Sequence, residues 1–226
     1  MMNSSPDIDV ATAQPRWTRK PDARPEEVLE AALNLFAQNG FAATRMDDIA
    51  KAAGLSKAAI YLYFPSKDDV FKALIETRVV KIRTQMSAIA DDKSVDPISG
   101  LREFVRLWAA SNADSRMVAI PRIVLSESAR FPDLADYYHK TVISQTQVAL
   151  KTLLEAGITQ GLFRPIDTKV AAKALMSPML FEMLRRQAFT DDHDEVPLTT
   201  LFEAFFNLFL NGISSTIVLT SQGTDT

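Results

Sequence analysis

The feature that most constrains the fold is the segment 44–64, in which two short helical patterns flank a single glycine. A helix-turn-helix needs a scaffold helix, a tight turn and a second helix that packs back on the first. Gly54 stands between the two patterns and can adopt a positive φ without the cost of a Cβ atom. The segment therefore predicts a helix-turn-helix. Its apolar inner face is expected to consist of Ile49, Ala50, Ala53, Leu55, Ile60 and Phe64.

The outer face of the second helix carries residues that suit a DNA groove. Lys57 and Tyr61 are one helical turn apart, so their side chains leave the same face. Ala58 and Ala59 are small and let the helix backbone come close to a duplex. Taken singly, a lysine is usually a surface residue, and Tyr61 and Tyr63 could be half-buried packing residues. At this spacing and beside this turn, the set indicates a DNA-reading helix.

Proline and glycine divide the whole chain into helical segments with apolar residues at helical spacing. The pattern predicts an all-α fold of about nine helices, with no strand and no internal repeat. The expected helices are 25–39, 45–53, 57–64, 66–90, 97–113, 116–129, 133–160, 168–190 and 197–219. Capping boxes are expected at Thr44 with Asp47 and at Ser66 with Asp69, and single N-caps at Ser56 and Asp167.

The composition excludes several kinds of site. The chain has no cysteine, so it has no disulfide, thiolate metal site or cysteine nucleophile. Its two histidines, His139 and His193, lie too far apart for metal-ligand spacing. No nucleophile elbow, phosphate loop or dinucleotide fingerprint points to catalysis. The acidic run 191–195 is either a metal site or a solvated loop between helices. We expect no catalytic residue, no cofactor and no metal.

Charge and hydropathy favour a cytoplasmic protein that contacts phosphate at one end. No apolar stretch approaches the roughly 18 residues of a membrane span, and residues 1–15 lack the order of a signal peptide. The net charge is −3, yet residues 16–67 hold eight basic and six acidic side chains. A mildly basic head on an acidic body suits nucleic-acid binding at the head alone. The basic patch 16–24 is either an arm that reaches along DNA or a solvated tail.

A dense pattern of residues between Pro25 and Leu74 carries a specific resemblance. It includes Gly40-Phe41, Thr44, Asp48-Ile49-Ala50, Ala53-Gly54-Leu55-Ser56-Lys57 and Ile60-Tyr61-Leu62-Tyr63-Phe64-Pro65-Ser66-Lys67-Asp68. This pattern resembles the N-terminal domain of the TetR family of transcriptional regulators, and the body loosely resembles the efflux-repressor (AcrR-like) branch. The expected organisation is a disordered N-terminal arm (1–22), a helix-turn-helix DNA-binding domain (23–66) and a larger helical ligand-binding and dimerisation domain (67–226).

The resemblance implies a set of DNA-contacting residues. Lys57, Ala58 and Ala59 would face base edges in the major groove, where a lysine can address a guanine. The residues expected to contact phosphate, or a thymine methyl in the case of the tyrosines, are Thr44, Arg45, Tyr61, Tyr63 and Lys67, with Ser56 beside them. Tyr63 replaces the histidine often found there. Asp47 stands where relatives can have a basic residue, which argues against a base contact from the first helix.

Two apolar helices at the end of the chain predict a homodimer. They could form half of a four-helix bundle completed by a partner, as the resemblance also implies, or simply the core of the protomer. Two reading heads would bind two half-sites of a palindromic double-stranded operator. The residues expected at the dimer interface are Met183, Phe202, Phe205, Phe206 and Phe209.

The resemblance also places an effector pocket among the long helices. An effector would move the helix 66–90 and change the separation of the two heads. The expected function is a transcriptional regulator, a repressor released from its operator by a small hydrophobic effector. The alternatives are a helical enzyme or carrier, and a helix-turn-helix used only for protein interaction. Each candidate wall of this pocket can also be interpreted as plain core, and the candidates are Phe104, Trp108, Met117, Ile120, Tyr138, Met176 and Leu180. Three polar residues are either anchors for the effector or surface groups: Arg122, Glu127 and His139.

Overall fold

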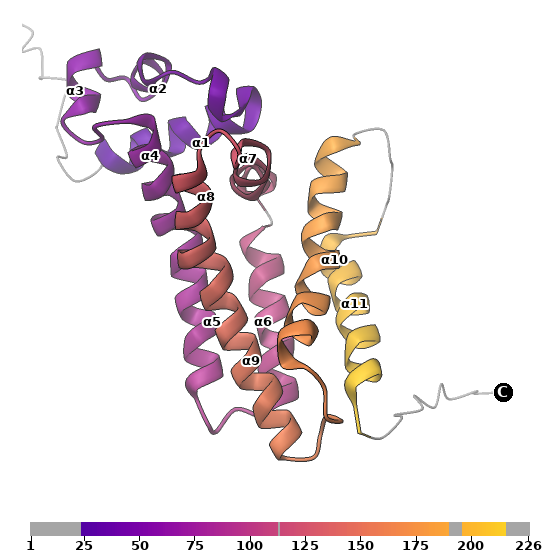
Figure 1. Ribbon diagram of the computed structural model, residues 1–226. Helices are drawn as coiled ribbons and strands as arrows, with labels where there is room; N and C mark the ends of the chain where they lie inside the picture. Colours follow the sequence, from indigo (N-terminus) through magenta and orange to yellow (C-terminus); the bar gives the residue numbers. More distant parts are fainter. Residues whose placement is uncertain (1–23, 113, 190–195, 216–226) are drawn as a thin grey trace, which may run out of the picture.

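The computed structural model describes residues 24–112, 114–189 and 196–215 (Figure 1). Within these ranges the chain is all-α, as predicted, and its only extended pairing is a single bridge between Phe163 and Ser214. Two long rods contain π-helical turns in their middles, and counting each rod once gives the nine helices expected. In order these are α1 (Arg24–Ala43), α2 (Met46–Ala52), α3 (Lys57–Tyr61), α4–η2–α5 (Lys67–Leu74, Ile75–Val80, Lys81–Asp91), α6 (Pro97–Ser111), η3–α7 (Ser115–Val118, Ala119–Glu127), α8–η4–α9 (Pro132–Tyr138, His139–Ile143, Ser144–Thr159), α10 (Thr168–Ala188) and α11 (Leu198–Ile213).

The first three helices and α4 form a compact head around an aromatic cluster. Phe36, Phe41 and Phe71 are fully buried, and their ring centroids lie 5.3 to 5.8 Å apart in tilted and edge-on arrangements. The cluster does not end at the border of the head, because the ring of Phe41 also lies edge-on against Phe131 of the body, at 5.2 Å. One hydrophobic core therefore continues from the head into α7 and α8.

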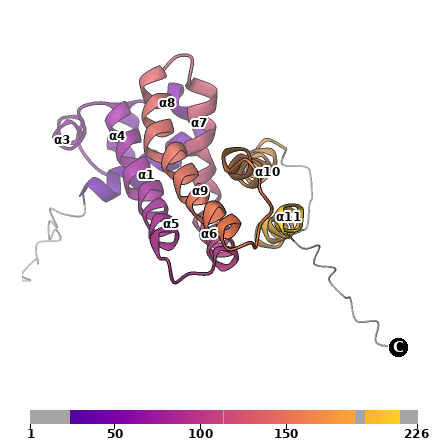
Figure 2. The same cartoon turned by 60° about the horizontal axis from the view of Figure 1, so that its bottom comes forward.

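The body is a bundle in which α10 and α11 lie side by side along one edge (Figures 1 and 2). The α4–η2–α5 rod starts in the head and runs down the opposite side, next to the α8–η4–α9 rod. A second hydrophobic cluster fills the space between α5, α6, α9, α10 and α11. No helix among the described residues is long and apolar enough to cross a membrane.

Most of the predicted helix boundaries are confirmed by their caps. The Ser56 hydroxyl accepts from the N–H of Ala59 at 3.2 Å, Ser66 does the same for Asp69 at 3.2 Å, and Asp167 caps α10. Gly40 has a φ of 77° and ends the regular part of α1, where the sequence predicts that a glycine with positive φ stops the helix.

Three details of the predicted boundaries were wrong. Helix α3 ends at Tyr61 and not at Phe64. The capping box of α2 is shifted by one residue, because the N–H of Arg45 bonds the carboxylate of Asp48 at 3.2 Å while Thr44 is buried and bonds elsewhere. Helix α11 ends at Ile213 and not at 219. The Ser215 N–H donates to the carbonyl of Leu162 at 3.0 Å, a tertiary pairing that takes the chain out of the helix.

The predicted N-terminal arm 1–22 and the acidic run 191–195 lie outside the described residues.

Candidate DNA-binding surface and effector cavity

The turn between α2 and α3 is built by one glycine and one buried isoleucine. Gly54 has a φ of 67°, a conformation that side chains with a Cβ rarely adopt. The next residue, Leu55, donates its N–H to the carbonyl of Ala50 at 2.8 Å, which closes the turn. Ile60 is fully buried and anchors α3 against the head. The geometry is that of a helix-turn-helix whose second helix packs only one of its faces against the head.

The opposite face of α3 is exposed to solvent. Lys57 and Ala58 are exposed, and so are Tyr61 at 44% and Tyr63 at 39% of their surfaces. Leu62, which was not among the expected site residues, is 85% exposed and stands between the two tyrosines. A leucine so exposed beside a reading helix is available for apolar contact with a thymine methyl group or a sugar.

Lys57 is held by an ion pair from the neighbouring helix. Its Nζ lies 2.9 Å from the Oδ2 atom of Asp47 on α2, and both side chains are more than half exposed. The hydrogen bond and charge of Asp47 raise the pKa of Lys57 above its ordinary value. In the free protein the reading lysine is therefore paired with an acid that a duplex would have to displace.

Two of the residues expected to contact phosphate serve the head itself. Thr44 is 2% exposed, and its hydroxyl donates to the carbonyl of Gly40 at 2.8 Å. The ammonium group of Lys67 donates to the carbonyls of Phe41, Ala42 and Thr44, and burial lowers its pKa. Because a lysine has three donor hydrogens, this set uses the ammonium fully. The buried side chain of Thr44 fastens the end of α1 and is not accessible to phosphate, which corrects that expectation. Lys67 fastens the same segment in the free protein, and its contact with phosphate stays a prediction. Arg45 remains exposed.

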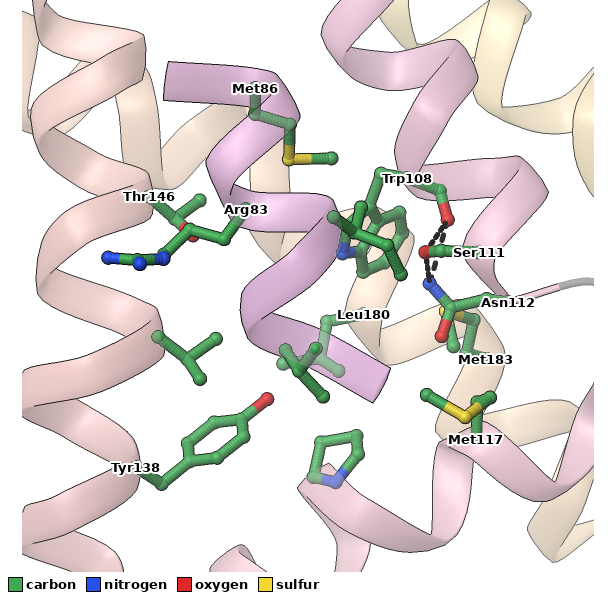
Figure 3. A pocket seen from close by; sticks show the side chains of 14 residues that line it. Arg83, Met86, Trp108, Ser111, Asn112, Met117, Tyr138, Thr146, Leu180 and Met183 are labelled. Atoms are coloured by element: carbon green, nitrogen blue, oxygen red, sulfur yellow. Dashed lines mark hydrogen bonds between the residues drawn. The ribbon is translucent and has the colours of Figure 1, made fainter. Parts of the chain in front are cut away.

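The body encloses a cavity of two adjoining chambers between α5, α6, α7, η4–α9 and α10. Their volumes are about 70 and 230 Å³. Both chambers share six lining residues, so they are parts of one cavity, whose narrower chamber Figure 3 shows. The shared residues are Trp108, Pro121, Tyr138, Val142, Thr146 and Leu180.

Five of the seven expected pocket residues line this cavity. Trp108, Tyr138 and Leu180 border both chambers, while Met117 lines the smaller one and Met176 the larger. The other two were assigned wrongly. Ile120 is 1% exposed and belongs to the core shared by head and body, and Phe104 is fully buried in the second hydrophobic cluster.

The polar groups proposed as anchors lie elsewhere. The guanidinium of Arg122 donates to the carbonyl of Ala37 at 3.0 Å and so ties α7 to the end of α1. His139 is exposed, and neither it nor Glu127 lines the cavity.

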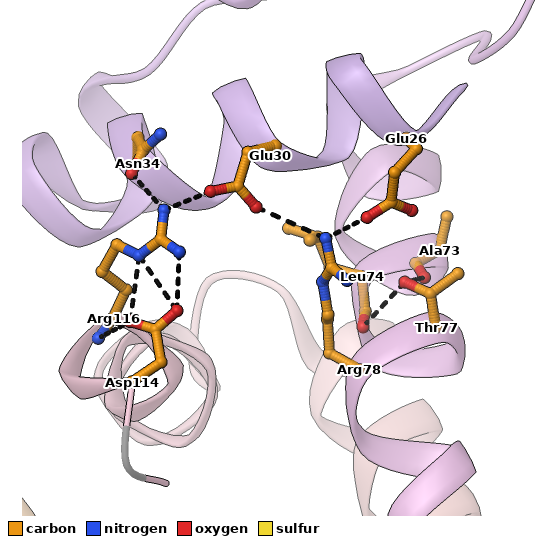
Figure 4. A network of polar contacts seen from close by, with 9 residues as sticks. All are labelled: Glu26, Glu30, Asn34, Ala73, Leu74, Thr77, Arg78, Asp114 and Arg116. Atoms are coloured by element: carbon orange, nitrogen blue, oxygen red, sulfur yellow. Dashed lines mark hydrogen bonds and ion pairs between the residues drawn. The ribbon is translucent and has the colours of Figure 1, made fainter. Parts of the chain in front are cut away.

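A network of ion pairs joins the head to the rod that lines the cavity. Arg78 in η2 contacts Glu26 and Glu30 of α1, and Arg116 in η3 contacts Glu30 as well (Figure 4). Asp114, which caps the start of η3, lies 2.6 Å from Arg116 and holds its guanidinium in place. The head is therefore fixed to two elements of the body through one helix, α1.

The edge formed by α10 and α11 exposes apolar side chains. On α10, Val170 and Phe181 are 62% and 66% exposed, and Ala174 between them is exposed too. On α11, Leu208 is 71% exposed. Val170, Ala174 and Leu208 line one surface groove of about 450 Å³ between the two helices.

The individual dimer residues expected from the sequence are in part wrong. Met183, Phe202 and Phe206 are 2% exposed or less and pack inside the protomer, so they have no surface to offer a partner. Phe205 and Phe209 are half-buried against the protomer's own core. In the structure α11 has one buried apolar face and one exposed apolar face. The sequence pattern could not distinguish them, because it shows both as one wide apolar stripe.

This fold and its exposed reading helix define a helix-turn-helix DNA-binding regulator. Residues 28–74 match the family model described as bacterial regulatory proteins of the TetR family, and residues 99–196 match the C-terminal domain of AefR-like transcriptional repressors. The chain belongs to the TetR family of transcriptional regulators, which bind DNA and are generally repressors.

Three relatives illustrate the similarity. The transcriptional regulator YfiR of Bacillus subtilis is 29% identical over 147 residues, which cover 65% of this chain and 71% of YfiR. The flavonoid-responsive regulator FrrA is 31% identical, with a TM-score of 0.55, over 85% of this chain and 98% of FrrA. SmeT, the repressor of the multidrug efflux pump SmeDEF of Stenotrophomonas maltophilia, has the same fold at 20% identity, with a TM-score of 0.70 over 89% of this chain and 96% of SmeT.

Two groups of residues were missed by reasoning from the sequence. The network of Glu26, Glu30, Arg78 and Arg116 joins positions far apart in the chain, and no local pattern announces it. Arg83 lines the cavity with Val79, Ile82 and Met86. That arginine had a signal, because it interrupts an apolar face at the spacing of one helical stripe.

Proposed function

We propose that this protein is a homodimeric repressor that leaves its operator when a small hydrophobic molecule fills the cavity of the body. The observation that carries the proposal is the exposed face of α3 beside a closed helix-turn-helix, where Lys57, Ala58 and Tyr61 are accessible to a duplex. Lys57 addresses a guanine, and the small Ala58 and Ala59 let the helix enter the major groove. Arg45, Ser56, Tyr61 and Tyr63 surround this contact and reach the backbone of the operator.

Dimerisation follows from the exposed edge of the body. The apolar side chains of α10 and α11, with Val170, Phe181 and Leu208 most exposed, suit a four-helix contact with the same edge of a second copy. Two heads then read the two halves of a palindromic operator, which gives a specificity that one short helix cannot supply.

Release follows from where the cavity lies. Val79, Ile82 and Met86 belong to the rod that continues upward into α4 of the head. A ligand that displaces this rod also moves Arg78 and, through its ion pairs, α1. By linkage, an effector that weakens operator binding is itself bound more weakly by the DNA complex.

The test is a titration of purified protein against labelled duplex DNA from the region flanking its own gene. We expect the fluorescence anisotropy to report tight binding that weakens steeply with salt, with a slope of roughly 0.9 for each phosphate neutralised. A compound shown by quenching of tryptophan fluorescence to bind the protein should lower the anisotropy again.

Each half of the proposal can fail separately. If no duplex binds even in dilute buffer, the DNA-reading function is wrong. If the duplex binds but no compound that enters the cavity releases it, then the effector-controlled part is wrong and the cavity is structural.

A further inference from the structure

The mostly apolar lining of the cavity includes basic side chains. Neither chamber has an aspartate or glutamate in its lining, whereas Arg83 lines the narrower chamber and Lys173 the wider one. Arg83 enters from α5, and in Figure 3 its guanidinium lies on the same side of the cavity as Thr146 of α9. The electrostatic balance of the cavity is therefore positive.

Arg83 differs from most other arginines of the body, because no hydrogen bond or ion pair joins it to another described residue. Arg106 and Arg116 each pair with a carboxylate, and Arg122 bonds the carbonyl of Ala37. The Nε atom of Arg83 is buried and has no hydrogen-bond partner among the described residues. A buried donor without an acceptor is costly to the folded state. A ligand that supplies the acceptor removes that cost.

Of the other polar groups of the narrow chamber, Ser111 and Asn112 have no donor to spare. Their side chains already donate to the carbonyl of Trp108, both at 2.7 Å, and the amide of Asn112 also donates to the Ser111 hydroxyl at 3.0 Å. The hydroxyl of Tyr138, directed into the cavity in Figure 3, has no hydrogen-bond partner among the described residues. Burial raises the pKa of Tyr138 to about 12, so its hydroxyl keeps its proton and can donate at neutral pH. The buried Nε of Arg83 and the protonated phenol of Tyr138 are thus two donors in the lining of the narrow chamber that can serve an anion.

The wider chamber fits the rest of such a molecule. It is lined by Met176, Leu180, Val124 and other apolar groups, and its volume is about 230 Å³. An engineered apolar cavity of about 150 Å³ is large enough to bind benzene. The wider chamber therefore accommodates an aromatic ring system or a short aliphatic chain.

We propose that the effector is an amphipathic organic acid, whose carboxylate is bound by Arg83 and Tyr138 while its apolar part occupies the chamber beside Met176 and Leu180. This inference rests on the proposed function for the identity of the cavity as the effector site. It goes further in naming the chemical class of the effector and the residue that selects it.

The test measures ligand binding alone, without DNA. Isothermal titration calorimetry compares 2-naphthoate with 2-naphthamide, and octanoate with octanamide, on the full chain. Charge-assisted hydrogen bonds are worth more than neutral ones, and we expect at least one acid to bind about 10- to 100-fold more tightly than its amide. Arg83→Met should remove this preference by weakening the acid and leaving the amide nearly unchanged.

The matched control is Arg106→Met, which removes an exposed arginine of α6 and should keep the preference for the acid. A second readout excludes a merely structural role. Since Arg83→Met deletes an unpaired buried donor, its melting temperature without ligand should equal or exceed that of the parent protein.

Three results would overturn the proposal. They are equal affinity of both acids and their amides for the parent protein, an undiminished preference in Arg83→Met, and a marked loss of thermal stability in Arg83→Met. A protein that binds the acids as expected but stays bound to its operator would leave the acid-binding site standing and would contradict only the effector part of the proposed function.

Discussion

The base contact that we propose for Lys57 requires this lysine to leave its ion pair with Asp47. The pair is exposed on both sides, and exposed ion pairs contribute little stability, roughly 0 to 1 kcal/mol. Loss of the pair on binding would therefore cost little, but in the proposed complex the carboxylate of Asp47 would lie close to the DNA and repel phosphate. We therefore expect Asp47 to lower the affinity of the head for DNA and to limit the contacts that Lys57 makes outside a correct site.

This restraint gives a prediction at the level of single residues. Lys57→Ala should cost about 1 to 3 kcal/mol of operator binding and relax the preference at one base pair. Asp47→Ala should strengthen binding to all duplexes and reduce the difference in affinity between the operator and unrelated DNA. Anisotropy titrations with operator variants measure both effects.

The control for these variants is Lys93→Ala, an exposed lysine of the body that should leave binding unchanged. Equal losses on every sequence for Lys57→Ala would show that this lysine contacts only phosphate, and weaker binding by Asp47→Ala would show that Asp47 positions Lys57 productively.

The exposed face of α3 could be predicted from the sequence better than the residues that support it. Lys57, Ala58 and Tyr61 follow from helical spacing alone, and all three are exposed as expected. Thr44 and Lys67 fall at the right places in the motif, yet they bond the carbonyls at the end of α1. The Thr44 bond is local, to a residue four positions earlier, whereas only the folded head brings carbonyls to Lys67 from more than 20 residues away, so spacing could not reveal the role of Lys67.

Among the helices, α10 is held at its end by a cluster around a buried carboxylate. Glu182 is 7% exposed and accepts hydrogen bonds from Arg185 at 2.8 Å and Arg186 at 2.7 Å. Arg186 also donates to the carbonyl of Val196 at 2.7 Å, just before α11. The cluster therefore connects α10 to the start of α11.

This cluster predicts a pH-dependent stability. Its hydrogen bonds lower the pKa of Glu182 from 4.5 to about 2. A lowered pKa stabilises the fold at pH values above the ordinary pKa, and the contribution is lost as the pH falls from about 4.5 toward 2. Glu182→Gln should reduce the unfolding free energy by on the order of 2 kcal/mol at pH 7, and the difference from the parent protein should shrink near pH 3.

Thermal melts of both proteins at pH 7 and pH 3 check this. Glu155→Gln is the control, since Glu155 forms an exposed pair with Lys151 at 3.4 Å and should shift the melting temperature little at either pH. A Glu182→Gln deficit that is the same at both pH values would contradict the titration argument.

Helix positions were predictable where the signals are local. Proline, glycine and capping residues act within one turn, so the start of α4 at Ser66 and of α10 at Asp167 were correctly predicted. The end of α11 and the π-helical turns η2 and η4 were not. The first depends on pairing with the loop 162–164. The two π turns contact one another beside the cavity, and no local pattern encodes them.

For the molecule as a whole, the exposed edge of α10 and α11 predicts the oligomeric state. Phe181→Glu combined with Leu208→Glu places two charges on the face proposed for dimerisation, while both side chains point away from the protomer's core. We expect a folded monomer in analytical ultracentrifugation and a large loss of operator affinity, although the head is unchanged.

The control is Val148→Glu, which introduces a charge at an equally exposed position of α9. A double variant that stays dimeric would place the interface elsewhere, and a monomer that still binds the operator tightly would show that two linked heads are unnecessary. Substitutions at Phe205 and Phe209 are less informative, because those rings also pack within the protomer.

The edge-on contact between Phe41 and Phe131 has a consequence for how such a regulator can evolve. A DNA-binding domain that shares its aromatic core with the body cannot be exchanged as an independent unit. Recombination that exchanged only the first three helices between relatives would leave mismatched rings at the interface between head and body. New operator specificities in this lineage are therefore reached more readily by point changes on the outer face of α3 than by swapping whole heads.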